Sequence, residues 1–262
     1  MIALDAGNTR IKIGYYDGTG QRVWVRHWDA AQPCDMFGQI VFCQTEQRVL
    51  EPQHWCIAPT GYRFQTEAFI QSVRKVRPND TFETVTYRSI SMKFAVPVSE
   101  KTGIDRLLGI YAASVLKPDV PVLVADAGSA VTVDLLKDGG YCGGAVVPGF
   151  RFLAETFPRI SERLPLVEFD AQGIPPYPCR NTEESLVSGI YWTLIGAVRQ
   201  FAELSSAAMI FLTGGDGEWL YDGLKRYFPA ERLVLKPELV LDGIYFSVTA
   251  PRTRDTKKYR LE

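Results

Sequence analysis

Short apolar runs separated by glycine-rich turns cover much of the chain, and they predict strands joined by hairpins. The first apolar run ends at Asp5, and a second run, Ile11 to Tyr16, follows a turn of Gly7, Asn8 and Thr9. This pattern predicts a strand, a tight turn and a second strand, with the acid at the end of the first strand.

Other segments alternate between strand-like and helix-like patterns. Strands are predicted at 21–28, 54–58, 82–86 and 208–213, and helices at 64–76, 104–116, 150–160, 182–204 and 219–228. Turns are predicted at 17–20 and 137–140, a partly helical stretch within 29–53, a loop at 166–180 and a frayed tail from 251. Three strands followed by alternating helix and strand indicate a mixed α/β protein.

The hairpin that starts the chain has a second copy about half a chain length later. An apolar strand again ends in Asp126, and Gly128 and Ser129 again lead into another strand. This self-similarity indicates two related halves, which the Pro-rich link around 117–121 divides into domains 1–118 and 119–262. If the halves face each other, they enclose an interdomain cleft with two turns and two carboxylates.

Each turn has the chemistry of a phosphate site. Open backbone N–H groups at Gly7, together with the side chains of Asn8 and Thr9, suit phosphate oxygens, and Asp5 can hold a hydrated divalent cation. Either hairpin by itself could equally be a plain turn whose Asp serves only as a cap. The repetition favours the phosphate interpretation.

Composition limits the remaining possibilities. The 262 residues carry a formal charge of −1, with 46% hydrophobic and 23% charged residues. These values suit a soluble, cytoplasmic globular protein and do not suggest a nucleic-acid binder. We find no apolar run of about 18 residues that could span a membrane. The two histidines and five scattered cysteines give no zinc spacing, and neither a P-loop nor a Rossmann fingerprint occurs.

The paired motifs, Asp5-Ala-Gly-Asn-Thr and Asp126-Ala-Gly-Ser-Ala, resemble the phosphate motifs of the acetate and sugar kinase, Hsp70 and actin superfamily. With Gly103-Ile-Asp-Arg106 and the glycine loop at 214–215, the sequence is similar in order to type III pantothenate kinases over nearly its whole length. The resemblance implies two ribonuclease-H-like (actin-like ATPase) domains of α/β class. It also implies transfer of the ATP γ-phosphoryl group to pantothenate, with Mg²⁺ and a monovalent cation, K⁺ or NH₄⁺, in a homodimer.

The resemblance also implies roles for individual residues. Asp105 would be the general base, and pantothenate would contact Gly103, Ile104, Asp105, Arg106 and Thr182. ATP would contact Asp5, Ala6, Gly7, Asn8, Thr9, Arg10, Lys12, Gly128, Ser129, Gly214 and Gly215. Asp5 and Asp126 would be the cation-associated acids.

Local explanations remain open for several of these residues. Asp105 could simply complement a helix dipole, with Arg106 as its surface partner. Lys12 could be a solvated strand residue, and Asn181, just before Thr182, is interpreted as a helix cap.

The sequence departs from the family pattern in one loop that bears on function. Phe94 and Pro97 replace a Tyr-x-Asn-Pro motif, and the spacing to Gly103 is about two residues longer. Two alternatives therefore stay open: a regulatory, ligand-sensing relative that has lost catalysis, and a kinase of another small hydroxy acid. The intact Asp5, Asp105 and Asp126 argue against the first, and Arg106 with Thr182 argues against the second.

Overall fold

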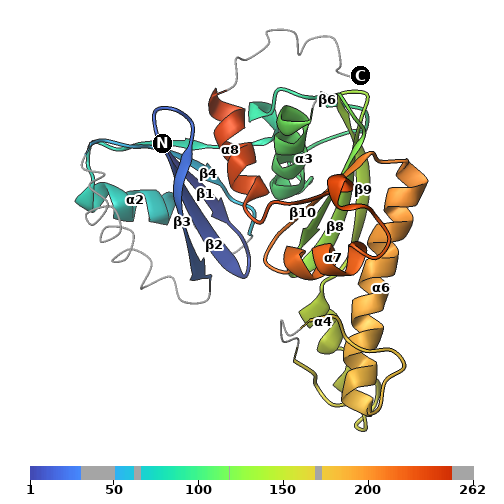
Figure 1. The fold of residues 1–262 in the computed structure, drawn as a ribbon. Coiled ribbons are helices and arrows are strands. Elements are labelled where there is room, and N and C mark those ends of the chain that lie inside the picture. The colour runs from blue at the N-terminus through green and yellow to red at the C-terminus, as the bar shows by residue number, and fades with distance from the viewer. Residues whose placement is uncertain (31–50, 62–65, 118, 169–172, 250–262) are drawn as a thin grey trace. The chain divides into compact units, whose positions relative to one another are not determined.

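The computed structural model describes residues 1–30, 51–61, 66–117, 119–168 and 173–249, which form two compact units (Figure 1). Unit 1 comprises Met1–Ser91, Val98–Tyr111 and Val240–Glu262, and unit 2 comprises Met92–Pro97 and Ala112–Leu239. The assignment of ribonuclease-H-like domains to 1–118 and 119–262 stays a prediction. Within the described residues, no helix has both the length and the apolar character needed to cross a membrane.

Unit 1 is built on a sheet with the strand order β3-β2-β1-β4-β5. Its strands are β1 (Ile2–Ala6), β2 (Arg10–Tyr16), β3 (Arg22–Asp29), β4 (His54–Ala58) and β5 (Thr81–Thr84). The first three strands are antiparallel neighbours, whereas β4 runs parallel to β1 and β5 runs parallel to β4. The central strand β1 therefore has an antiparallel partner on one side and a parallel partner on the other.

One face of this sheet is covered by helix α2 (Thr66–Val76), as Figure 1 shows. The buried side of α2, which includes Phe69 and Val73, packs with Leu4 and Ile13 in one apolar cluster. Leu4 and Ile13 are partners in the β1–β2 register, so their neighbours along the strands point to the opposite face.

The opposite face of the sheet carries helix α8 (Leu239–Thr249). A Cβ atom added at Gly14 of β2 would lie 3.2 Å from the Leu241 side chain of α8. The Tyr16 hydroxyl donates a hydrogen bond of 2.8 Å to Asp242, and the Tyr16 ring stacks on Tyr245 with centroids 4.5 Å apart. Burial, and then the nearby Asp242 carboxylate, raises the pKa of Tyr16, so its hydroxyl stays protonated and keeps donating.

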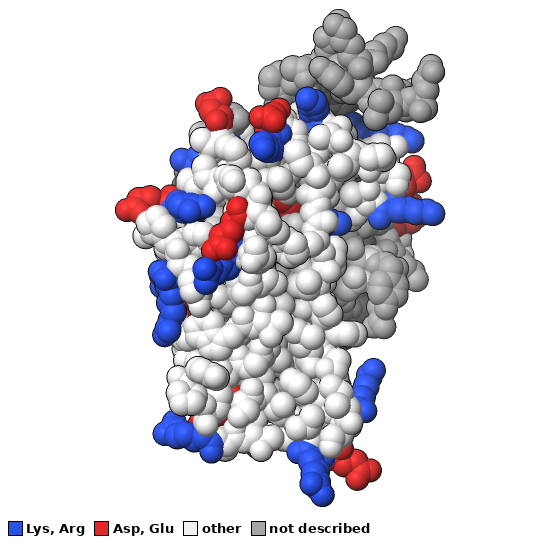
Figure 2. Space-filling view, turned by 90° about the vertical axis from the view of Figure 1, so that its right-hand side faces the viewer, with Lys and Arg blue, Asp and Glu red and all other residues white. Residues whose placement is uncertain are grey.

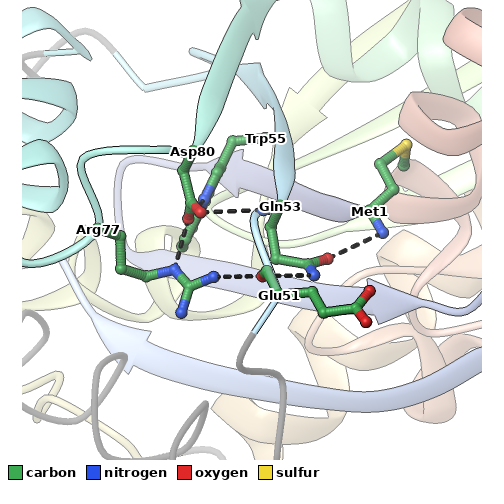
Figure 3. A network of polar contacts seen from close by, with 6 residues as sticks. All are labelled: Met1, Glu51, Gln53, Trp55, Arg77 and Asp80. Atoms are coloured by element: carbon green, nitrogen blue, oxygen red, sulfur yellow. Dashed lines mark hydrogen bonds and ion pairs between the residues drawn. The ribbon is translucent and has the colours of Figure 1, made fainter.

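A polar network joins the loop after α2 to the start of β4 (Figure 3). The Asp80 carboxylate is 1% exposed and accepts three hydrogen bonds. The donors are the Gln53 backbone N–H (2.9 Å), the Trp55 indole N–H (2.8 Å) and the Arg77 Nε (2.6 Å). The Gln53 side chain in turn accepts from the Met1 amino group at 3.3 Å. A buried carboxylate with three donors fixes this end of the sheet.

Unit 2 repeats the strand arrangement of unit 1. Its sheet has the order β11-β10-β7-β8-β9-β6. The strands are β6 (Lys93–Phe94), β7 (Val122–Ala127), β8 (Ala130–Lys137), β9 (Gly140–Pro148), β10 (Met209–Thr213) and β11 (Leu233–Leu235). Strands β7, β8 and β9 are antiparallel neighbours, while β10 and β11 extend the sheet in parallel from β7. Strand β7 thus has the position that β1 has in unit 1.

Two helices, α6 (Thr182–Ser205) and α7 (Gly217–Leu224), bury their apolar sides in the core of unit 2. The core includes Ile190, Leu194 and Leu220 from the helices and Val131 and Ile210 from the sheet. Helix α6 extends past the sheet, and α4 (Phe150–Ala154) lies beside its projecting half (Figure 1). The hairpin turn between β8 and β9 has positive φ at Asp138 and Gly139, which is typical of the predicted two-residue turn.

Three predicted elements differ from the structure. The helix predicted at 150–160 is divided into α4 and α5 (Phe157–Ile160), because Pro158 has no N–H and its ring would clash with the carbonyl of Ala154 in a continuous helix. Helix α7 begins at Gly217 and ends at Leu224, before Phe228, where Pro229 disfavours helical backbone. Strand β5 begins and ends earlier than predicted, at Thr81–Thr84. The predictions for most of 29–53 and for the tail from 251 lie outside the described residues.

The Asp80 network gives a first testable prediction. We expect Asp80→Ala to lower the free energy of unfolding by about 3 kcal/mol, because it leaves the Arg77 guanidinium and the Trp55 indole without their buried acceptor. Urea denaturation measures the change. Asp119→Ala, at an exposed position, is the control and should stay within about 0.5 kcal/mol of wild type. Equal effects of the two variants would contradict the stabilising role of the network.

Candidate functional site

The first predicted phosphate turn lies at the end of β1, as its sequence pattern indicated. Asp5 is buried, with 9% exposure, whereas Asn8 and Thr9 are exposed. A Cβ atom added at Gly7 would lie 2.7 Å from the Arg10 carbonyl oxygen, so the tight turn requires glycine. The turn therefore has an acid at its base and exposed polar residues at its tip.

Two basic residues of β2 were predicted to contact ATP together with Ala6. Lys12 is the register partner of Asp5, and both lie on the sheet face opposite α2. Arg10 lies across from Asp29 of β3, and Ala6 is fully buried beside Ile11. Lys12 is half-buried next to an acid, and its predicted contact with a phosphate stays a prediction beside the alternative of a solvated strand residue.

A loop that sequence reasoning missed packs against this turn. The Thr60 hydroxyl donates a 2.7 Å hydrogen bond to Asp5 Oδ1, and the Gly61 N–H donates a 2.6 Å bond to the Ala6 carbonyl. A Cβ atom at Gly61 would lie 2.6 Å from the carbonyl carbon of Gly7. The signal was present: a buried strand, β4, is followed by Pro-Thr-Gly, and parallel strands end at the same edge of a sheet.

The predicted general base lies in the first turn of helix α3 (Ile104–Leu116). Asp105 is half-buried, and its Oδ1 accepts a 2.8 Å hydrogen bond from the Arg106 amide. A Cβ atom at Gly103 would lie 2.6 Å from the same oxygen. Asp105 thus complements the helix N-terminus. This local role does not exclude a chemical one, since a carboxylate can accept several hydrogen bonds.

The second predicted phosphate turn lies at the end of β7. Asp126 is half-buried and Ser129 is exposed, and the Gly128 N–H donates a 2.9 Å hydrogen bond to the Ala130 carbonyl. The Gly149 N–H donates a 3.0 Å bond to the Ser129 carbonyl, and any side chain at Gly149 would collide with the backbone of this turn. The end of β9 is therefore packed on the turn.

The predicted adenosine loop contacts the same turn. Gly214 has a φ of +86°, and a Cβ atom there would collide with the Ala127 carbonyl and the Asp126 carboxylate. The Asp216 N–H donates a 2.9 Å hydrogen bond to the Ala127 carbonyl. Gly214 thus passes close to Asp126 because it carries no side chain.

Thr182, the remaining predicted contact, is the first residue of α6 and is exposed. The cap is Asn181, whose side chain accepts a 2.8 Å hydrogen bond from the Glu184 amide, as predicted. The Glu184 carboxylate accepts from the Arg180 amide at 2.9 Å, and not from Asn181 as a capping box would require.

The predicted residues are divided between the two units. Asp5, its turn, Lys12, Asp105 and Arg106 belong to unit 1, and Asp126, its turn, Gly214, Gly215 and Thr182 belong to unit 2. Across the described part of the chain, no three His, Cys, Asp or Glu side chains gather in a way that could enclose a metal ion. The acids are therefore separate carboxylates at strand and helix ends.

Comparisons with known proteins agree on one family and one fold. The family model described as type III pantothenate kinase matches residues 1–204. A type III pantothenate kinase of Alkalilimnicola ehrlichii is 29% identical over 256 residues, which cover 93% of this chain and 95% of that protein.

Solved structures extend the agreement to the fold. One, titled a conserved putative Baf family transcriptional activator from Campylobacter jejuni, has a TM-score of 0.57 at 19% identity and covers 95% of this chain and 97% of its own. Another, titled a putative 2-dehydro-3-deoxygalactonokinase from Sinorhizobium meliloti, has a TM-score of 0.54 at 18% identity and covers 99% of both chains. Sugar kinases and actin-like ATPases share the arrangement of two ribonuclease-H-like domains, so the predicted fold class is confirmed.

The packing of Gly214 gives a second prediction. We expect Gly214→Ala to lower the free energy of unfolding by at least about 2 kcal/mol, because the added Cβ strains a backbone with positive φ and collides with the Asp126 turn. Thermal and urea denaturation measure the loss. Gly196→Ala, within α6 and with open space around the added methyl group, should instead raise stability by about 0.5–1 kcal/mol. A neutral Gly214→Ala would contradict the close packing.

Proposed function

Because the chain belongs to the type III pantothenate kinase family, we propose that its acid-tipped turns serve the transfer of the ATP γ-phosphoryl group to the primary hydroxyl of pantothenate. This reaction is the first step of coenzyme A synthesis. The observation that supports the residue assignment most strongly is the repetition of an Asp-Ala-Gly turn on the central strand of each sheet. Phosphoryl transfer needs little covalent chemistry from the protein and depends on positioning and charge neutralisation.

Asp5 is the proposed magnesium-associated acid. Magnesium in kinases is usually held by one or two carboxylates together with phosphate oxygens and water. A single buried carboxylate at the base of a polar turn fits that requirement, and the lack of a larger acid cluster among the described residues is compatible with it. Asp5 would hold the hydrated cation at the phosphates, and the cation would supply charge neutralisation during the transfer. Gly7, Asn8, Thr9, Arg10 and Lys12 would hold the same phosphates.

The second turn is proposed for the other phosphates and for a monovalent cation. Ser129 offers an exposed hydroxyl, Gly128 beside it has no side chain to block a phosphate, and the Asp126 carboxylate is an oxygen ligand suited to K⁺ or NH₄⁺. Gly214 and Gly215 are proposed to line the adenosine side, and Gly214 brings this loop against the Asp126 turn.

Asp105 and Arg106 are proposed for pantothenate. Asp105 would orient the primary hydroxyl and accept its proton, and Arg106 would bind the substrate carboxylate through two hydrogen bonds. Gly103 and Ile104 would form the adjoining wall, and Thr182 would donate a hydrogen bond to the substrate.

The enzyme is proposed to act in the cytoplasm as a homodimer. The three described cysteines, Cys56, Cys142 and Cys179, are free thiols, as expected in a reducing compartment. The face of the molecule in Figure 2 is uncharged over much of its lower half. Several large apolar residues of unit 2 are exposed around α4 and the following loop: Phe152, Ile160, Leu166 and Tyr177. Such a surface is typical of an interface between subunits.

The kinase assignment gives a third prediction. Purified protein should phosphorylate pantothenate with ATP and Mg²⁺, and the rate should depend on K⁺ or NH₄⁺. Asp105→Asn should lower kcat by about 10²–10⁴-fold, because an amide cannot accept the hydroxyl proton. A coupled ADP-release assay measures both effects, with Asp119→Asn as the matched control at an exposed acid.

The outcomes separate the alternatives. A folded protein without turnover under any cation would contradict the kinase assignment and favour a ligand-sensing relative. Turnover with another small hydroxy acid but not with pantothenate would contradict the substrate. Turnover that survives Asp105→Asn would remove Asp105 as the base.

The homodimer gives a fourth prediction. Sedimentation should give about twice the 29.4 kDa mass of one chain. Phe152→Glu should shift the protein to monomer, because a charge in the centre of an apolar interface is not compensated. Val23→Glu, at an exposed apolar position of β3 in unit 1, is the control and should leave the mass unchanged. A monomeric wild type would contradict the proposal.

A further inference from the structure

The side chain of Thr60 contacts an acid to which the proposed function gives a central task. Its hydroxyl donates a 2.7 Å hydrogen bond to Asp5 Oδ1, across a separation of 55 residues in sequence. Because an ionised carboxylate only accepts hydrogen bonds, the hydroxyl hydrogen must point at Asp5. Bonds from a neutral donor to a carboxylate are short and strong, which restricts the orientation of both side chains.

The backbone around Thr60 is held on both sides. The Thr60 N–H donates a 3.0 Å hydrogen bond to the Ala58 carbonyl, and the next N–H, at Gly61, donates to the Ala6 carbonyl. Pro59, between Ala58 and Thr60, has a φ angle that its ring fixes. Thr60 therefore offers its hydroxyl from a restrained loop, and Gly61 lets that loop approach the phosphate turn closely.

The internal repeat shows what is particular to this position. Ala58 is the register partner of Asp5, as Thr213 is of Asp126. Three residues further on, the Gly61 N–H bonds to the carbonyl after Asp5, as the Asp216 N–H bonds to the carbonyl after Asp126.

By this correspondence Thr60 occupies the position that Gly215 occupies in unit 2. Gly215 has no side chain that could bond to Asp126, whereas Thr60 bonds to Asp5. The loop after β4 thus supplies a hydroxyl to Asp5, whereas the equivalent loop after β10 has no side chain at the corresponding position beside Asp126.

We propose that Thr60 is a positioning residue that fixes the Asp5 carboxylate in the orientation needed to hold Mg²⁺ on the bound nucleotide. This rests on the proposed role of Asp5. Residues that hydrogen-bond to a metal-associated carboxylate orient it, and their loss weakens metal affinity or activity by about 10–100-fold.

Binding of a nonhydrolysable ATP analogue, measured by isothermal titration calorimetry with Mg²⁺ and with EDTA, tests the proposal without turnover. The dissociation constant in EDTA divided by that with Mg²⁺, called the Mg²⁺ ratio below, gives the contribution of Mg²⁺ to binding. Thr60→Val, which keeps the shape and removes the donor, should reduce this ratio by about 10-fold and leave binding in EDTA unchanged. Thr60→Ser, which keeps the hydroxyl, should restore it. Circular dichroism and the thermal midpoint check that each variant is folded.

The Asp5→Asn variant tests whether Thr60 affects Mg²⁺-dependent binding through the Asp5 carboxylate. If Thr60 acts through Asp5, Thr60→Val should add nothing further in the Asp5→Asn background, as a double-mutant cycle would measure. An unchanged Mg²⁺ ratio in Thr60→Val, an equal loss of binding in EDTA, or a Thr60→Ser variant as weak as Thr60→Val would overturn the proposal.

The same experiment distinguishes the two levels of inference. If Asp5→Asn lowers the Mg²⁺ ratio to about one and Thr60→Val leaves the ratio unchanged, only the role of Thr60 fails. If Asp5→Asn also leaves the ratio intact, the role of Asp5 fails and the role of Thr60 fails with it. Steady-state kinetics adds a further readout: Thr60→Val should raise the Mg²⁺ concentration for half-maximal activity about 10-fold and leave KM for pantothenate unchanged.

Discussion

The pairing of each acid-bearing strand with one antiparallel and one parallel neighbour is the constraint on which both units depend. The antiparallel partner returns through a tight turn immediately after the acid, and the parallel partner ends at the same edge and sends its own loop across that turn. Strand order alone therefore brings together a carboxylate, a turn with exposed polar residues and a second backbone segment. Glycine at Gly61 and Gly214 lets the second segment approach, since a Cβ atom there would overlap the turn.

Local signals were sufficient to predict the hairpins and most helices. The Asp-Ala-Gly turns, the start of α3 and the Asn181 cap each depend on residues within a few positions of one another, and the structure contains all of them. The predicted continuous helix at 150–160 was wrong because Pro158 interrupts the backbone hydrogen bonding that the apolar spacing around it would otherwise support.

Contacts between distant segments could not be derived from spacing. The bond from Thr60 to Asp5 requires knowing that β4 lies parallel to β1, and the assignment of α8 to unit 1 requires the contact between Tyr16 and Asp242. Such pairings depend on which strands become neighbours, and a single sequence does not contain that information directly. The Pro-Thr-Gly after β4 could be recognised in the sequence, but its contact with the Asp5 turn could not.

The two units share one strand arrangement but differ in detail around their acids. The turn after Asp5 is one residue longer than the turn after Asp126, since Ala6 pairs with Ile11 whereas Ala127 pairs with Val131. The loop facing Asp5 has Thr60, whose hydroxyl bonds to the acid, and the loop facing Asp126 has Gly215 at the equivalent position. Phosphoryl transfer needs a rigid charge near the reacting phosphate and an open surface for the nucleoside. Under the proposed function, the small differences at equivalent positions would provide these two features, while the strand pairing that places the acids stays the same.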